Sequence, residues 1–175
     1  MTVLHRRPDR TEAVEYYFRY IDQTEGDDVR AIVASQTSEA LRLLEGISEE
    51  ASLPRYAPDK WSVREVVNHI SDCERMFAFR AFWFARGFDT PLPDFDQLIA
   101  AGAAGANALP LATHLAEFRA VRSATEALFA NLPDDAWSRR GVASGNPFTV
   151  RAMAFVLAGH ASHHLRSVRE RYLGA

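Results

Sequence analysis

Apolar positions recur at helical spacing along two long segments in the first half of the chain. The first segment follows two good N-cap candidates, Asp27 and Asp28, and stops at Gly46. The second opens with Ser62-Val63-Arg64-Glu65, a capping box in which a serine and a glutamate cap each other's backbone. It should extend to about Gly87. These patterns predict two long helices.

Two more segments in the second half of the chain carry the same spacing. One begins at Pro110, because proline is favoured at the first helical position, and ends before Pro133. The other follows Thr149, a predicted N-cap, and extends to about Tyr172. A shorter helix is expected over residues 11–22. The chain is therefore predicted to be all-α, with four long helices and a short N-terminal one.

Residues 47–61, 88–109 and 133–148 connect the four predicted helices and exceed the short loops of a simple up-down bundle. An extended link of about 15 residues can return along a helix of about 30 Å and start a parallel neighbour. Single helical turns are expected near 96–101 and 134–139. The remaining part, 140–148, is expected to be a loop, since no strand-like alternation of useful length occurs. We expect one domain over residues 1–175.

The charge balance argues against a nucleic-acid partner. The chain has 20 Lys and Arg against 23 Asp and Glu, a formal net charge of −3, with Lys60 as its one lysine. Phosphate binding requires clustered basic residues, whereas the arginines of this chain are scattered.

Cellular location is inferred from the cysteine count and from the lack of targeting segments. Cys73 is the one cysteine, so no disulfide can form within the chain, which favours a reducing compartment. The N-terminus lacks the apolar stretch of a signal peptide, and no run approaches the ~20 apolar residues of a spanning helix. We expect a soluble, cytoplasmic protein without membrane contact.

The last predicted helix carries the most informative chemistry. At 100° per residue its core stripe is narrower than a right angle and contains Val150, Met153, Leu157, His160, His164 and Val168. Two imidazoles one turn apart on a core face form a bidentate metal clamp. Burying both imidazoles would cost free energy unless each had a bonding partner. In the alternative interpretation, that partner is a backbone carbonyl or a carboxylate and not a metal ion.

A third ligand is available on the helix that begins with the capping box. His69 lies at the margin of its core stripe, about 10 Å from the helix start, while His164 lies about 12 Å from the end of the last helix. In an antiparallel pair these side chains stand at one level. We therefore predict that His69, His160 and His164 bind one divalent metal ion, with water in an open position, as in catalytic zinc sites.

Five further residues near the predicted site have two interpretations each. Cys73 is either a fourth ligand or reactive thiol, or a small buried hydrophobe. Glu65 and Asp72 could orient His69, or lie on a solvated face. Arg80 falls on a core stripe and needs either a carboxylate partner or a substrate. His163 could shuttle protons, or be exposed.

Two motifs resemble one family. The run from Lys60 to Arg80 resembles the second bundle helix of the DinB-like superfamily, and residues 159–165 resemble its histidine motif. That family includes metal-dependent hydrolase-like proteins and bacillithiol and mycothiol transferases. The resemblance implies a four-helix bundle with an up-up-down-down course. It also implies a divalent ion, often zinc or nickel, held by the residues matching His69, His160 and His164.

Several functions are compatible with such a site. The resemblance favours a thiol S-transferase, in which the metal activates a low-molecular-weight thiol that attacks an electrophile. A hydrolase using metal-bound water is the alternative, and so is a non-catalytic, dimeric, stress-related metal-binding protein. The segment from Met76 to Phe84 has apolar residues around its whole circumference, which predicts a homodimer.

Overall fold

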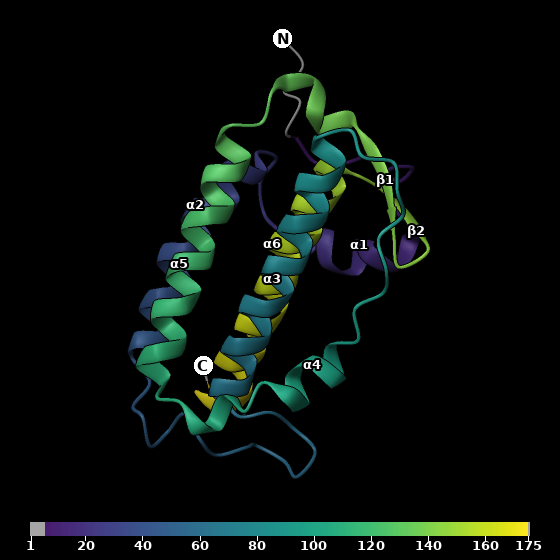
Figure 1. The fold of residues 1–175 in the computed structure, drawn as a ribbon. Helices are drawn as coiled ribbons and strands as arrows, with labels where there is room; N and C mark the ends of the chain where they lie inside the picture. The colour runs from purple at the N-terminus through teal and green to yellow at the C-terminus, as the bar shows by residue number, and fades with distance from the viewer. Residues whose placement is uncertain (1–5, 175) are drawn as a thin grey trace.

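The computed structural model describes residues 6–174 and contains a bundle of four long helices (Figure 1). They are α2 (Val29–Glu45), α3 (Val63–Ala85), α5 (Leu111–Ala130) and α6 (Val150–Tyr172). The smaller helical elements are α1 (Glu15–Ile21), α4 (Gln97–Ala103), η1 (Ala106–Ala108) and η2 (Asp134–Ser138). The predicted four-helix bundle and its short N-terminal helix are confirmed.

The predicted caps begin these helices. Ser62 Oγ accepts a hydrogen bond from the Glu65 backbone N–H at 3.2 Å, and the Glu65 carboxylate accepts one from the Ser62 N–H at 2.7 Å. Asp28 and Thr149 cap α2 and α6 with their side chains alone, which accept hydrogen bonds from the backbone N–H groups of Arg30 and Ala152. Each cap satisfies a donor that the first helical turn cannot use, so the starting residues are fixed by local sequence.

The course of the chain differs from the up-up-down-down course that was predicted. In Figure 1, α2 and α6 run downward, whereas α3 and α5 run upward. The first connection does not return along the bundle, because the Arg64 side chain holds it at one end. That guanidinium donates to Ser52 Oγ at 2.8 Å and to the Glu49 carbonyl at 3.0 Å. The one link that runs the length of the bundle joins α3 to α5, which makes those two helices parallel.

Residues 140–149 form a β-hairpin, so the prediction of a loop over 140–148 is wrong. Strand β1 (Arg140–Ala143) pairs antiparallel with β2 (Asn146–Thr149). The two turn residues, Ser144 and Gly145, both have positive φ, of 51° and 70°, as in the tight turns that hairpins prefer. Strands of four residues are too short for alternation to be detected, and Pro147 argued against a strand.

The interior contains two apolar clusters with polar residues between them. One cluster contains apolar residues from 63–70 of α3 and 161–168 of α6. The other contains apolar residues from 73–85 of α3 and 150–158 of α6. His69, His160 and Glu74 are buried near this junction. The Glu74 carboxylate pairs with Arg122 of α5 at 2.7 Å. The bundle thus has an interior polar layer, and the histidines belong to it.

Two phenyl rings of α3 face outward. Phe79 is 49% exposed and Phe82 is 36% exposed, and they border a shallow apolar groove between α3 and α5. The homodimer predicted from this helix stays a prediction.

Within residues 6–174 no helix has both the length and the apolar character needed to cross a bilayer.

Candidate metal centre

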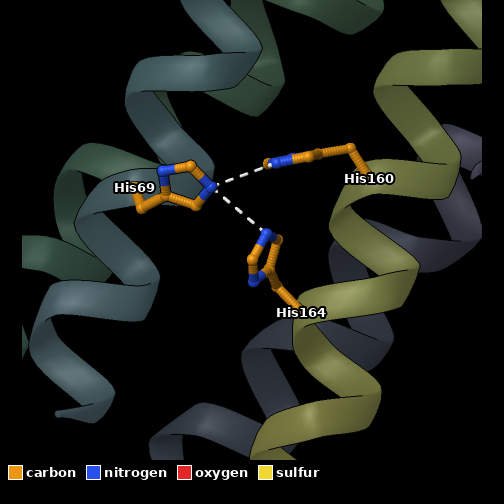
Figure 2. A group of neighbouring side chains, drawn as sticks. All are labelled: His69, His160 and His164. Carbon is orange, nitrogen blue, oxygen red and sulfur yellow. Dashed lines mark hydrogen bonds between the residues drawn. The ribbon is translucent and has the colours of Figure 1, made fainter. Parts of the chain in front are cut away.

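The antiparallel packing of α3 on α6 brings three predicted ligands together (Figure 2). His69 Nε2 lies 3.1 Å from His160 Nε2 and 3.2 Å from His164 Nε2. One nitrogen from each ring can be chosen so that all three lie within 4.8 Å of one another. The level match that predicted a common site, and the antiparallel orientation on which it depended, are both seen.

All three imidazoles are kept neutral by burial. His69 and His160 are 3% and 4% exposed, and His164 is partly buried. Loss of hydration lowers the pKa of His69 to about 4 and that of His164 to about 3. Burial also lowers the pKa of His160, and the neighbouring histidines add to that effect. Neutral imidazole is the form that binds a metal ion.

Hydrogen bonds cannot satisfy this arrangement. A neutral imidazole Nε2 carries either one hydrogen or one lone pair. It can therefore make a single hydrogen bond, yet His69 Nε2 faces two other Nε2 atoms at hydrogen-bond distance. At most one of these contacts can be a full hydrogen bond, because the single hydrogen or lone pair of His69 Nε2 cannot point at both partners. A cation at the centre would accept all three lone pairs, so the donor set fits a divalent ion such as zinc.

Aromatic rings enclose the three imidazoles. The Trp61 ring centroid lies 4.6 Å from that of His69, and the Tyr20 and Phe77 rings lie 5.6 Å and 5.5 Å from His160. Tyr20 reaches the site because α1 packs directly on α6 at Gly159. A Cβ atom at that position would lie 2.0 Å from the Tyr20 carbonyl oxygen. The glycine before His160 thus permits a backbone contact that helps to build the site.

Cys73 is one turn beyond His69 on α3 and contacts it. Its Sγ lies 3.6 Å from His69 Nδ1 and 3.7 Å from Nε2. The side chain is 2% exposed, and burial raises the pKa of its thiol to about 12. Without a metal the thiol is therefore protonated. Its position keeps open both interpretations, a small buried hydrophobe and a fourth ligand.

The other candidates divide into residues near the site and residues engaged elsewhere. Arg80 is buried but has no carboxylate partner among the described residues; it donates to the Pro93 carbonyl and to Ser144 Oγ. His163 is exposed, and its Nδ1 lies 3.4 Å from Gln23 Nε2. Glu65 serves the helix cap and pairs with Arg55, and Asp72 pairs with Arg75. Neither carboxylate orients His69.

A cavity of about 330 Å³ adjoins the centre. It lies between α1, α3, the segment leading into α4, and the hairpin turn, and it reaches His160 and Cys73. The remaining lining residues are Tyr16, Tyr17, Tyr20, Met76, Phe77, Arg80, Asp94, Phe95, Asp96, Gln97, Leu98 and Ser144. A small molecule in this cavity would have access to the histidine cluster.

Sequence reasoning missed most of this cavity wall. Tyr17 and Tyr20 come from the short helix α1, and Asp94 and Ser144 come from segments expected to be loops. None of them has a spacing that points to a site. The Ser144-Gly145 dipeptide, which is typical of turns, was the one local signal in this segment, and the structure gives both residues positive φ.

Comparison with known proteins agrees with the fold. The family model of the DinB superfamily matches residues 32–168. The structure is similar to YfiT from Bacillus subtilis, described as a probable metal-dependent hydrolase with an unusual four-helix bundle topology. The TM-score is 0.73 at 16% identity, with 98% of each chain covered. No curated protein matches the chain. Because the family model spans most of the sequence and includes all three histidines, this chain belongs to the DinB superfamily.

Proposed function

We propose that this protein is a metal-dependent enzyme whose ion is bound by His69, His160 and His164. The observation that carries the proposal is the meeting of three Nε2 atoms that hydrogen bonds cannot satisfy. Neutral nitrogen donors suit zinc and nickel, which are the ions we expect. YfiT, which has the same fold, is described as metal-dependent, and this supports the assignment.

The reaction we propose is transfer of a low-molecular-weight thiol to an electrophilic substrate. When bound, the ion supplies positive charge that lowers the pKa of a coordinated thiol or water. The residues of the chain provide three neutral donors, aromatic rings that restrict water, and a cavity through which substrates enter. Among residues 6–174 no carboxylate contacts the three imidazoles. A metal-held thiolate needs no separate base, so this arrangement suits thiol chemistry.

Hydrolysis by metal-bound water is the second candidate. It is favoured by the description of YfiT as a probable metal-dependent hydrolase. A closed site with Cys73 as fourth ligand would instead indicate a structural ion, because structural zinc is held by four protein ligands. The three interpretations differ in what occupies the fourth position of the ion.

Metal content per chain, measured by elemental analysis, tests the site. We expect about one ion per chain in the wild type after reconstitution with zinc or nickel. His164→Ala should lose it, whereas His163→Ala should keep it, since His163 is exposed on the neighbouring position of the same helix. If wild type takes up no metal, or if His164→Ala retains it fully, the proposed centre is wrong.

Two assays on the loaded protein separate the reactions. In the first, a thiol and 1-chloro-2,4-dinitrobenzene are supplied; the sulfur bonds to the ring carbon and chloride leaves. In the second, an activated ester is supplied with water alone. Metal-dependent turnover in the first and not in the second supports thiol transfer, and the reverse supports the hydrolase. Cys73→Ser tests the interpretation of a structural ion, since loss of a fourth ligand would lower the affinity for the ion strongly.

A further inference from the structure

A guanidinium is buried in the wall of the cavity that adjoins the histidine cluster. Arg80 is 4% exposed and lines this cavity together with His160. Its hydrogen bonds both start from Nη2, which donates to the Pro93 carbonyl at 2.8 Å and to Ser144 Oγ at 2.9 Å. A guanidinium has five N–H groups, so the three on Nε and Nη1 are not used in these contacts.

The Arg80 guanidinium forms no direct ion pair within residues 6–174, because no carboxylate there lies within ion-pair distance of it. The charge of Asp94 acts on Arg80, but this exposed carboxylate is hydrogen-bonded to Ser144 and to the backbone of Phe95. Burial lowers the pKa of Arg80, yet an arginine stays protonated at neutral pH.

A second buried arginine of the bundle, Arg122, shows what a structural guanidinium looks like here. Arg122 is fully buried, and its Nε lies 2.7 Å from a Glu74 carboxylate oxygen, with Gln36 accepting a further hydrogen bond. A buried charge costs several kcal/mol unless it is paired, which is why Arg122 has a carboxylate partner. Arg80 lacks such a partner and borders a cavity. Its position therefore favours an anionic ligand.

The rest of the cavity wall combines aromatic rings with polar side chains, among them the exposed carboxylates of Asp94 and Asp96. Tyr17, Tyr20, Phe77 and Phe95 contribute rings to its wall. Its volume of about 330 Å³ is at the lower end of the range for small-molecule sites. An apolar or aromatic body with one charged end would match both the rings and the guanidinium.

We propose that this cavity binds a small organic carboxylate, with Arg80 holding the carboxylate and the aromatic wall holding the body of the molecule. The proposal rests on the proposed function in that the opposite, reactive end of the ligand would face the three histidines. Arg80 is thus the residue that selects an anionic substrate over a neutral one.

Calorimetric binding of benzoate and of its neutral analogue benzamide tests this selection. Both ligands are titrated into metal-free protein, where the carboxylate cannot bind to an ion. The wild type should bind benzoate more tightly than benzamide. Hydrogen bonds to a charged group contribute about 1.5–3 kcal/mol, so Arg80→Gln should weaken benzoate binding about 10- to 100-fold. Benzamide binding should be nearly unchanged.

Two variants keep the test independent of folding. Arg80→Lys retains the charge and should keep part of the preference for benzoate, whereas Arg80→Gln should abolish it. Arg86→Gln removes an exposed arginine of the same helix end and should bind both ligands as the wild type does. If Arg80 only anchors Pro93 and Ser144, the glutamine and lysine variants lose thermal stability without a change in the benzoate-to-benzamide ratio. That result, or undetectable benzoate binding to the wild type at millimolar concentration, would overturn the proposal.

Further titrations of zinc-loaded protein identify which reactant carries the carboxylate. If Arg80→Gln weakens the binding of 3-mercaptopropionate but not that of 3-mercaptopropionamide, the thiol is the reactant that carries the carboxylate. If only benzoate is affected, it belongs to the second substrate. Failure of the metal centre is recognised separately, since a protein without metal uptake can still show Arg80-dependent benzoate binding. A protein with stoichiometric metal but no such preference refutes this inference alone.

Discussion

Replacing Gly159 by alanine separates local helix preference from tertiary packing, because the two predict opposite signs. Glycine inside a helix is about 1 kcal/mol less favourable than alanine, so propensity alone predicts that Gly159→Ala stabilises α6. In the structure the new Cβ would lie 2.0 Å from the carbonyl oxygen of Tyr20 and 2.4 Å from its carbonyl carbon. Both obstructing atoms are backbone, so no side-chain rotation can relieve the contact.

The magnitude follows from the displacement that the contact requires. Carbon atoms out of bonding range are ordinarily about 3.5–4.0 Å apart, so α1 would have to move by more than about 1 Å. Overpacking a close-packed interior costs about 1–3 kcal/mol, and a backbone obstruction belongs at the upper end of that range. After the gain in helix propensity is subtracted, we expect a net destabilisation of about 2 kcal/mol.

Urea denaturation followed by circular dichroism measures this loss, with Gly102→Ala as the matched control. Gly102 is also helical, in α4, but a Cβ atom at that position would have nothing within 4 Å, so its replacement should not destabilise the protein. For a chain of this size the expected loss corresponds to a fall in Tm of about 4–8 °C. A Gly159→Ala protein as stable as the wild type would refute the direct packing of α1 on α6.

Three further predictions concern other parts of the bundle. The metal-free protein should lose stability in urea titrations as pH falls from about 7 toward 4, because the pKa values of His69 and His164, about 4 and about 3, lie below the value of about 6.5 in the unfolded chain. The unfolded state binds more protons in that window, and pH-independent stability would contradict this. Glu74→Gln should cost about 3–5 kcal/mol by the same assay, because it leaves the Arg122 charge buried and unpaired; a loss below about 1 kcal/mol would argue against that pair. Ser62→Ala should cost about 1 kcal/mol through the lost cap of α3, and an unchanged denaturation midpoint would show that the cap is dispensable.

Much of the fold could be predicted from local sequence because helices are specified locally. The capping box at Ser62, the N-cap at Thr149 and the helical spacing of apolar residues each act within a few positions of the chain. The same periodicity placed His160 and His164 on one face, and the level match with His69 needed no more than the rise of a helix.

The course of the connections could not be predicted in this way. A long link is compatible with either a return along the bundle or a compact turn at one end. The choice was made by contacts of Arg64 with Glu49 and Ser52, which are far from it in sequence. The hairpin was missed for a related reason: four-residue strands gain their stability from pairing and from packing on neighbours, not from their own pattern.

The sequence by itself therefore determined the helices, their core faces and the three histidines that meet. The tertiary structure decided what surrounds them: the Tyr20 ring that α1 brings beside His160, the cavity, and the buried guanidinium of Arg80 in its wall. The physical reason is the range of the interactions. Helix spacing and capping act over three or four residues, whereas burial and charge pairing depend on segments that only the folded bundle brings together.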